Sequence, residues 1–202
     1  MRVPGCGPIP SRLMFIGDYP GYEECKRGIP WVGKAGKEFD RGLWNARLER
    51  HQVYMTNVLK TQPESKVPSA AEIERDEPAL YQELQDARPE TIVTLGAMSA
   101  RWFLGDNFTL ERDHAIPRET DIHNEHWGKV HHATVFPMCN PAAGLHIPTL
   151  QPLIAYDWQQ LRAFLEGNYI PHSLDLFHGK EDYNVISGME VFSFLETIGD
   201  KL

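Results

Sequence analysis

The chain has 202 residues, of which 42% are hydrophobic and 24% are charged. These proportions are those of a globular protein with one ordinary domain, and they exclude a fibrous or intrinsically disordered chain. No apolar run approaches the ~20 residues that a membrane-spanning helix requires. The first ten residues are too short and too rich in proline and glycine for a signal peptide. We therefore expect a cytoplasmic protein without a membrane partner.

The net charge of −8 argues at first sight against a nucleic-acid-binding protein, whose binding surface is usually basic. The charges are, however, distributed unevenly along the chain. Residues 11–66 contain ten basic and seven acidic residues, whereas residues 67–126 contain five basic and thirteen acidic ones. A face formed by the first of these segments would still approach a phosphate backbone. The net charge alone therefore decides neither way.

Three cysteines, Cys6, Cys25 and Cys139, are an odd number without CxxC spacing. They provide neither a disulfide framework nor a four-cysteine metal site. We expect their thiols to be reduced.

The first part of the chain alternates short apolar runs with amphipathic segments. Residues 12–17 form an apolar run that ends in glycine, which is typical of a buried strand entering a loop. Apolar positions then recur at helical spacing over 34–48, which predicts an amphipathic helix. A second strand is predicted over 53–59, followed by a polar turn.

The middle of the chain continues this alternation. A capping-box sequence at 69–72 precedes a helix predicted over 73–84, which Pro78 is expected to kink or divide. A third strand is predicted over 91–96, and a helix over 97–104 follows it.

The last part begins with a polar segment of little periodicity, 105–128, which predicts a long surface excursion with at most a short strand at its far end. The fourth strand is predicted over 133–137. A loop rich in proline and glycine over 138–152 leads to a helix over 153–165.

Strands that alternate with helices predict an α/β fold, a three-layer sandwich whose central, mainly parallel sheet has four strands. In such sheets ligands bind beyond the carboxyl ends of the strands. The loops 17–33, 56–63 and 138–149 are therefore the candidates for a functional site. We expect one domain over 1–167, and over 168–202 an appendage or the start of a further domain.

Chemistry-bearing residues follow three of the predicted strands. Asp18 places a carboxylate directly after the first strand, and Trp31 lies in the same loop. Asn57 ends the second strand and Asn140 follows the fourth. These positions bring a carboxylate, an aromatic ring and two carboxamides to neighbouring strand ends.

Five segments carry a resemblance to a known family. They are LMFIGDYPG at 13–21, GIPWVGKAG at 28–36, VYMTNVLK at 53–60, LG at 95–96 and NPAA at 140–143. In this order and at this spacing they resemble the motifs of the family 4 branch of the uracil-DNA glycosylase superfamily.

The resemblance implies a DNA glycosylase that hydrolyses the N-glycosidic bond of uracil, or of a related deaminated or modified pyrimidine, and leaves an abasic site. Its partner would be DNA that presents a flipped or single-stranded pyrimidine, and a replication or repair protein is a further possible partner. Asp18 and Asn140 would be catalytic. The resemblance implies base-binding residues Gly17, Tyr19, Trp31 and Asn57, and DNA-binding residues Lys34, Lys60, Ala143, Leu145 and His146.

The sequence departs from the family pattern in three ways. Asn140 stands where the family usually has a histidine that donates to the uracil O2, and Asp18 is one methylene shorter than the usual glutamate. Thr61 and Asp76 stand where cysteines would ligate an iron–sulfur cluster, and the N-terminal CxxC is absent. We therefore predict no iron–sulfur cluster and no metal.

Each candidate residue also has a plainer interpretation. Asp18 would serve as a turn residue or helix cap, Trp31 as core packing, and Asn57 as a partner of the backbone at a strand end. Asn140 would form a turn before proline, and Leu145 would be buried instead of wedging into the base stack.

The histidines invite a metal site, but they lack a cysteine or carboxylate at a recognised ligand spacing, which favours a polar loop. They are His123, His126, His131 and His132. Cys139 is better explained as a small packing residue than as a nucleophile. The alternative function is a noncatalytic, repurposed DNA-binding protein of a base-modification or replication assembly.

Overall fold

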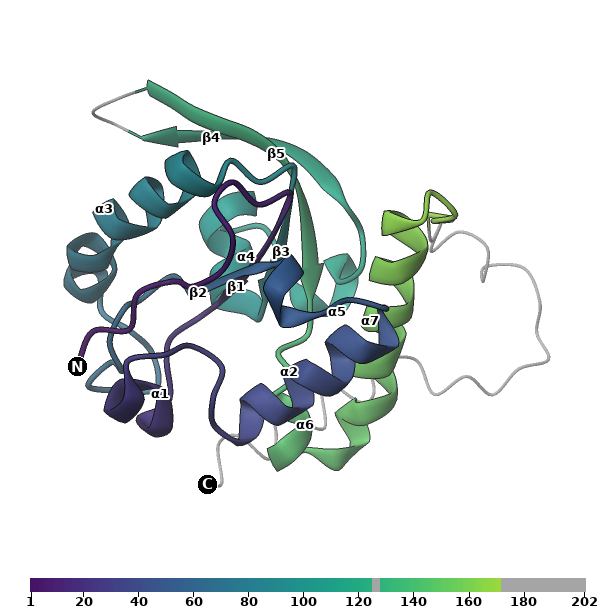
Figure 1. Ribbon diagram of the computed structural model, residues 1–202, viewed down its shortest axis with the longest axis horizontal. Helices are drawn as coiled ribbons and strands as arrows, with labels where there is room; N and C mark the ends of the chain where they lie inside the picture. The colour runs from purple at the N-terminus through teal and green to yellow at the C-terminus, as the bar shows by residue number, and fades with distance from the viewer. Residues whose placement is uncertain (125–127, 172–202) are drawn as a thin grey trace.

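The computed structural model describes residues 1–124 and 128–171 (Figure 1). The prediction for the segment 168–202 therefore lies almost entirely outside the described residues, as does His126. Within the described ranges, no helix is both long and apolar enough to span a membrane.

A five-stranded sheet forms the centre of the fold, in the order β2-β1-β3-β5-β4. Its strands are β1 (Leu13–Gly17), β2 (Tyr54–Asn57), β3 (Thr91–Leu95), β4 (Arg118–Asn124) and β5 (Gly128–Met138). The first three strands and β5 are parallel, and β4 pairs antiparallel with β5 at the edge. The predicted α/β class with a mainly parallel sheet is confirmed.

The predicted number of four strands was one too few. β4 arises within the polar segment 105–128, where we expected at most a short strand. Of its side chains, that of Ile122 is buried, so the alternation of apolar and polar residues is too weak to indicate a full strand. The edge position explains the polarity, because one side of an edge strand faces solvent.

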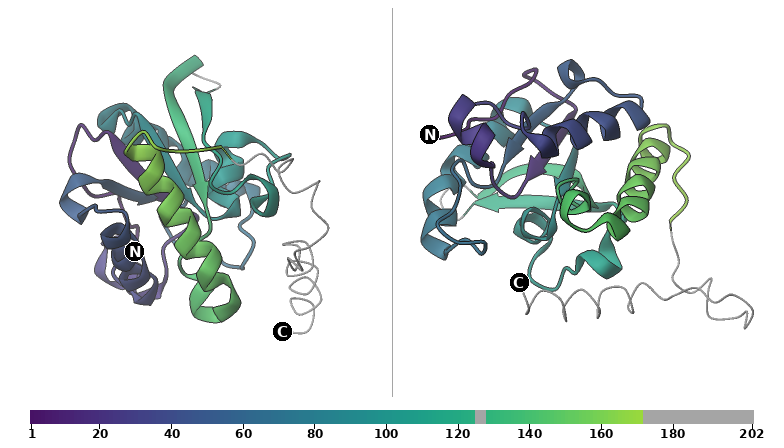
Figure 2. Two further views of the ribbon diagram at one scale, coloured as in Figure 1. Left: turned by 90° about the vertical axis from the view of Figure 1, so that its right-hand side faces the viewer. Right: turned by 90° about the horizontal axis from the view of Figure 1, so that it is seen from below.

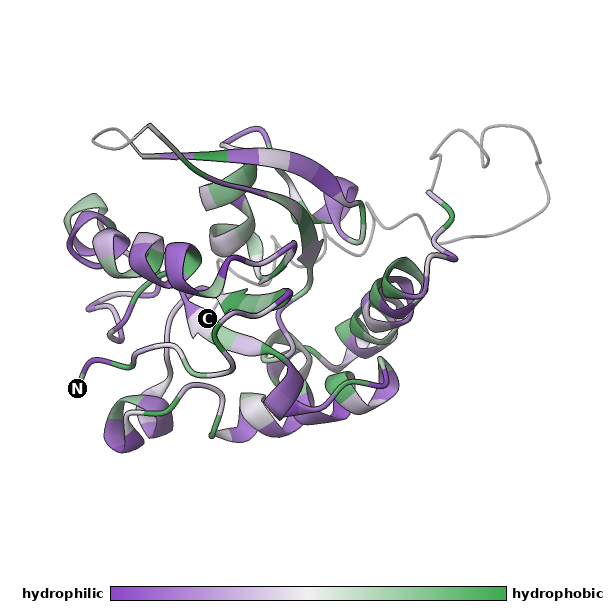
Figure 3. Ribbon diagram, turned by 45° about the horizontal axis from the view of Figure 1, so that its top comes forward, coloured by the Kyte–Doolittle hydropathy of each residue, from purple (hydrophilic) through white to green (hydrophobic). Residues whose placement is uncertain are grey.

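Helices cover both faces of the sheet (Figures 1 and 2). On one face α2 (Lys34–Asn45) and α7 (Gln151–Leu165) pack against side chains such as Phe15 and Val93. On the other, α3 (Ala70–Ala87) and α4 (Ala97–Leu104) pack against Met14 and Ile16. This is the three-layer arrangement that the alternation of the sequence predicted. In Figure 3 the central strands are mostly green, whereas α3 and the outer hairpin carry much purple.

The remaining elements are short. They are α1 (Tyr22–Arg27), α5 (Leu110–Asp113) and α6 (Ala143–His146), with the 3-10 turns η1 (Arg50–Gln52) and η2 (Pro148–Leu150). The loop predicted over 138–152 thus contains one helical turn and one 3-10 turn. Helix α3 begins at the predicted capping box of Ser69 and Glu72 and continues through Pro78, which does not divide it.

The parallel register aligns the carboxyl ends of the four parallel strands. Gly17 of β1 lies opposite Asn57 of β2 on one side and Leu95 of β3 on the other, and Leu95 lies opposite Met138 of β5. Residues that follow these strands are therefore neighbours at one edge of the sheet, where ligands of such folds bind.

Candidate functional site

A pocket of about 430 Å³ opens at this carboxyl edge. Seven of the residues that the resemblance assigned to a site line it, and they come from three separate loops. They are Asp18, Tyr19, Trp31, Asn57, Asn140, Ala143 and His146. A volume of this size accommodates one small-molecule-sized group such as a nucleobase.

Asp18 is held at the N-terminal end of helix α4. Its Oδ1 accepts the backbone N–H of Ser99 at 2.7 Å, and burial raises the pKa of the carboxyl above its ordinary value. Gly96 makes this approach possible, because it has φ +126° and a Cβ there would lie 2.4 Å from Oδ2 of Asp18. Asp18 therefore contacts a helix end, as one plainer interpretation had it, and also faces the pocket.

Trp31 lines the pocket and also belongs to the core. Its ring stacks on Phe39 with 5.0 Å between centroids, and Phe39 in turn contacts Phe15 of β1. The residue has φ 57°, and the guanidinium of Arg50 donates a hydrogen bond to its carbonyl oxygen. Core packing thus fixes the ring that forms one wall of the pocket, and stacking on a base stays a prediction.

Gly17 lies close to Trp31 and Asn57 but is not among the residues that line the pocket. A Cβ at Gly17 would come within 2.5 Å of Asn57 Oδ1 and 2.6 Å of Trp31 Cζ2, so a larger residue would displace both side chains. In the described part of the chain, no hydrogen bond engages the side-chain amide of Asn57. Its donors and acceptor are therefore available to a ligand, and it does not bond the backbone as the plainer interpretation held.

Asn140 follows β5 and faces the pocket from the opposite loop. Its Oδ1 accepts the backbone N–H of Ala142 at 2.9 Å, which forms the turn that we considered and leaves the amide NH₂ as a donor. The backbone just before it is fixed by Asp157 of α7, whose Oδ2 accepts the N–H of Cys139 at 2.7 Å. The other oxygen of Asp157 lies 2.5 Å from His114 Nδ1.

Comparisons with known proteins identify the family of the chain. Residues 4–162 match the family model described as the uracil DNA glycosylase superfamily. The chain belongs to the uracil-DNA glycosylase superfamily. It is 34% identical over 161 residues to the type-4 uracil-DNA glycosylase of Archaeoglobus fulgidus, with 79% of each chain covered. The resemblance to the family 4 branch is thereby confirmed.

Two further relatives have similar sequences. The type-4 uracil-DNA glycosylase of Sulfurisphaera tokodaii is 34% identical over 165 residues, which cover 79% of this chain and 73% of that protein. A protein of Bacillus phage SP01 named DNA polymerase is 26% identical over 165 residues, which cover 81% of this chain and 17% of that protein. Similar sequences thus occur in type-4 uracil-DNA glycosylases and in a part of a much longer phage protein named DNA polymerase.

The exposed candidates are next in sequence to residues that line the pocket. Lys34 begins α2 beside Ala35, which lines the pocket. Leu145 is 39% exposed in α6, next to His146, so the interpretation as a buried leucine was wrong. Both side chains are therefore exposed to solvent.

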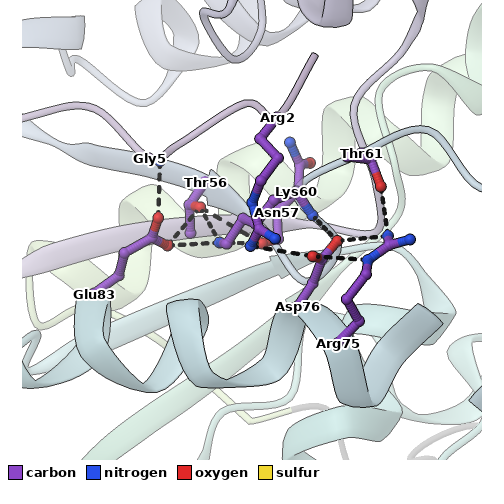
Figure 4. A network of polar contacts seen from close by, with 9 residues as sticks. All are labelled: Arg2, Gly5, Thr56, Asn57, Lys60, Thr61, Arg75, Asp76 and Glu83. Carbon is purple, nitrogen blue, oxygen red and sulfur yellow. Dashed lines mark hydrogen bonds and ion pairs between the residues drawn. The ribbon is translucent and has the colours of Figure 1, made fainter. Parts of the chain in front are cut away.

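Lys60 requires a correction, because in this superfamily member it is not available to DNA. Its side chain is only 2% exposed, and its ammonium donates to Thr56 Oγ1, to the backbone oxygen of Asn57 and to Glu83 Oε2, each at 2.7 Å (Figure 4). Burial lowers the pKa of Lys60, although the nearby Glu83 opposes this shift. Lys60 therefore fastens the end of β2 instead of contacting phosphate.

The positions that the resemblance assigns to iron–sulfur ligands are joined by polar contacts (Figure 4). Asp76 is fully buried, and its carboxylate contacts Arg2 at 3.1 Å, Arg75 at 3.0 Å and the backbone N–H of Lys60 at 2.8 Å. Arg75 also donates to Thr61 Oγ1 at 2.5 Å. Burial favours the neutral carboxyl, but these donors outweigh it and lower the pKa of Asp76.

The residues present do not fit an iron–sulfur cluster. Such clusters are held by cysteine thiolates, usually four. Cys6 lies in the N-terminal segment, Cys25 in α1, and Cys139 after β5, where burial and the nearby Asp157 raise the pKa of its thiol. The burial and raised pKa of Cys139 agree with packing and not with a nucleophilic thiolate.

The histidines point to separate partners. His131 Nε2 lies 2.5 Å from the carbonyl oxygen of Pro89, and His132 pairs with Asp121 and Glu119 on β4. His123 lies on β4 as well. Across 1–124 and 128–171, one group of three potential metal ligands occurs elsewhere, formed by His114, Cys139 and Asp157.

Sequence reasoning missed two buried acids that shape the site. Glu24 accepts the backbone N–H groups of Val32 and Gly33 at 2.9 and 2.7 Å and so holds the loop that carries Trp31. Asp157 holds the loop that carries Asn140. The signal for Asp157 was a single acid among the apolar positions of the helix predicted over 153–165, whereas Glu24 follows another glutamate and carries no such signal.

Proposed function

We propose that this protein is a monofunctional DNA glycosylase that hydrolyses the N-glycosidic bond of uracil, or of a related deaminated pyrimidine, and leaves an abasic site. The observation that carries the proposal is the convergence of Asp18, Trp31, Asn57 and Asn140 on one pocket of about 430 Å³. The family relationship supports the same class of reaction.

Asp18 would act on the sugar side of the scissile bond. Departure of the base develops positive charge on the deoxyribose, which a carboxylate stabilises, and the same carboxylate can accept a proton from the attacking water. Burial raises the pKa of Asp18, which makes its carboxylate a stronger base than an exposed one.

The base would lie between Trp31 and the two carboxamides. The indole wall offers an aromatic surface for stacking, and the Asn57 amide has an acceptor for N3–H and donors for O4. The Asn140 amide donor would stabilise negative charge that develops at O2 as the base leaves. Because a neutral amide donates more weakly than a cationic imidazole, we expect a slower reaction than one assisted by histidine.

The target nucleotide must leave the base stack to reach this pocket, so the substrate is a flipped or single-stranded nucleotide. Lys34 would attract a flanking phosphate, and the exposed Leu145 would insert where the base had been. Ala143 and His146 lie beside this wedge in the pocket wall.

We also propose that the reaction needs no iron–sulfur cluster. The hydrolysis itself requires no redox chemistry, and Asp76, Arg2 and Arg75 already join the segments that such a cluster would connect. Measurement of iron and acid-labile sulfide in the purified, active protein tests this proposal. Stoichiometric iron would contradict it.

The test of the activity is incubation of uracil-containing single- and double-stranded DNA with the protein, followed by alkaline cleavage. We expect strand cleavage at the uracil position and none at thymine. Hypoxanthine and 5-hydroxymethyluracil substrates define the base preference. Intact DNA at enzyme excess would refute the proposal.

A second candidate is a noncatalytic DNA-binding protein of a replication or base-modification assembly. The amide at Asn140 favours it, as does the similarity to the phage protein named DNA polymerase. This candidate predicts binding of uracil-containing DNA without turnover, with an affinity that Asp18→Asn leaves unchanged. Turnover that disappears in Asp18→Asn would exclude it.

A further inference from the structure

Two shallow hollows follow α2 away from the pocket that contains Asp18, Trp31 and Asn140, here called the base pocket. The first, of about 70 Å³, lies between α2 and α7, which pack side by side (Figure 1). It is lined by Glu38, Arg41 and Asn45 of α2 and by Pro141, which directly follows Asn140 of the pocket. The second, of about 460 Å³, shares Asn45 with the first. The pocket and the two hollows therefore follow one another along α2, and we call the two hollows together the groove.

The far hollow presents an exposed aromatic ring. Trp44 is 80% exposed and lines this hollow together with Leu48, Arg47 and Arg162. The indole of Trp44 therefore leaves an aromatic face free for a ligand at the end of this path. Aromatic rings beside cations are the elements with which proteins hold single-stranded nucleic acid, because every unpaired base offers a face for stacking.

The charges along this path are mixed but leave free donors. Arg41 pairs with Glu38 at 2.8 Å, and Arg47 and Arg162 approach Glu166 at 3.8 and 2.9 Å. A guanidinium has five N–H donors, so one such contact leaves most of them available to phosphate.

Two lysines of α2 and a glutamate just after it are further charged residues along this path. Lys34 and Lys37, on the same helix nearer the pocket, have no acidic partner among the described residues. Glu49 lines the second hollow and pairs with His51 at 3.1 Å. Exposed cations therefore follow α2 from the pocket to the far hollow.

We propose that single-stranded DNA leaves the base pocket along α2 and stacks an unpaired base on Trp44. The inference rests on the proposed function, since it takes the pocket as the site of the target base. From Ala35 to Trp44 the helix rises about 14 Å, which corresponds to about four stacked nucleotides. A base inside a duplex is stacked on both faces by its neighbours and has no free face for the indole, so the occupant is a single strand and not a duplex.

The groove lies on one side of the pocket. Nucleotides added to the strand should therefore increase the binding affinity on one side of the target base only. The probe is a five-nucleotide strand with a central 2′-fluoro-2′-deoxyuridine, whose glycosidic bond resists hydrolysis. It is compared with strands extended by six thymidines at either the 5′ or the 3′ end. We expect one extension to tighten binding by about tenfold or more and the other by less than about twofold.

Variants then assign this gain to the groove. Trp44→Ala, and separately the pair Arg41→Gln and Arg47→Gln, should remove most of the gain while the five-nucleotide strand binds as before. The matched control is the pair Arg12→Gln and Arg88→Gln, exposed cations near the amino ends of the strands. The control should keep the gain.

The outcomes separate this inference from the proposed function. Equal gains from both extensions, or a full gain in Trp44→Ala, would overturn the groove. If a short uracil-containing strand is nevertheless cleaved, the glycosylase proposal stands without it. If short strands are neither bound nor cleaved, the proposed function fails and the groove fails with it.

Discussion

Two aspartates in this molecule have pKa values that are shifted in opposite directions. Asp18 in the base pocket accepts a backbone N–H of Ser99, and burial raises its pKa. Asp76 beneath the end of β2 contacts two guanidinium groups and a backbone N–H, and its pKa is lowered. A buried carboxylate without a cationic partner is costly to ionise, and its raised pKa makes it a stronger base. A buried carboxylate with cationic partners stays ionised and can join the segments that carry them.

The comparison shows why residue type and burial alone do not reveal function. Both aspartates follow or face the carboxyl edge of the sheet, and both stand at positions where the family pattern has another residue. The partners determine the direction of the pKa shift. Asp18 contacts a backbone N–H at a helix end, whereas Asp76 contacts the cationic side chains of Arg2 and Arg75. Substitutions that change the partners or the charge should therefore affect the two sites in opposite ways.

The largest effect is expected for Asp18→Asn. Loss of the base and of the negative charge near the sugar should lower the single-turnover rate of uracil release by about 10²–10⁴-fold. The folded pKa of Asp18 is raised, so stability falls as pH rises from the unfolded value of 3.8 through the folded one. At neutral pH the neutral amide removes that cost, so thermal unfolding should occur at the same or a higher temperature.

Asp18→Glu provides the matched control for this prediction. It keeps the carboxylate, so activity should persist and should decline as pH falls through the raised pKa of the acid. A variant Asp18→Asn that is both active and less stable would show that Asp18 behaves like Asp76.

A second large effect is expected for Lys60→Met. Methionine fills a similar volume but leaves Glu83, Thr56 and the Asn57 carbonyl without their shared donor. Removing one partner of a buried ion pair typically costs about 3–5 kcal/mol of the free energy of unfolding. Chemical denaturation measures this loss, and Lys66→Met, at an exposed lysine of the same segment, should change stability by less than about 0.5 kcal/mol.

The double variant Lys60→Met with Glu83→Gln tests the origin of that loss. If the unpaired carboxylate causes most of it, the double variant should be more stable than Lys60→Met alone. Additive losses would show that Lys60 acts through packing. A stable Lys60→Met that binds DNA more weakly would restore the original prediction of a phosphate contact.

Much of this fold followed from periodicity, and the failures have physical causes. The strands at 12–17, 53–59 and 91–96 are buried on both faces, so their apolar runs are unmistakable. β4 was underestimated because an edge strand buries few side chains, and Pro78 did not end α3 although its sequence suggested a break.

The site was predictable where residues follow strands, because parallel register fixes their neighbours. Asp18, Asn57 and Asn140 were found in this way. Lys60 was misassigned because a motif position does not tell whether a lysine points outward or into the core. Glu24 was missed because its partners are backbone N–H groups of its own loop, which leave no pattern in the sequence. Asp157 was missed because a single acid among apolar positions does not reveal its partners, Cys139 and His114.

A smaller effect should follow from Gly96→Ala. An L-residue at φ +126° is strained by about 1–3 kcal/mol, and its Cβ would also press on the Asp18 carboxylate. Gly105, at the other end of α4, has φ +83° but no atom within 4 Å of a built Cβ. Gly105→Ala should therefore lower stability alone, whereas Gly96→Ala should lower both stability and the rate of base release. Equal activities in the two variants would argue that the position of Asp18 does not matter.

The smallest effect is a difference in how stability changes with pH in acid, and it concerns Asp76→Asn. The folded pKa of Asp76 lies below the unfolded value of 3.8, so its stabilising contribution is complete above that value and is lost as pH falls through the folded pKa. The wild type should therefore lose stability more steeply than Asp76→Asn between pH 4 and the folded pKa, and urea midpoints across this range measure the difference. The difference in stability between wild type and Asp18→Asn should change with pH in the opposite direction, because the pKa of Asp18 is raised. Parallel acid profiles for wild type and Asp76→Asn would mean that Arg2 and Arg75 do not hold this carboxylate ionised.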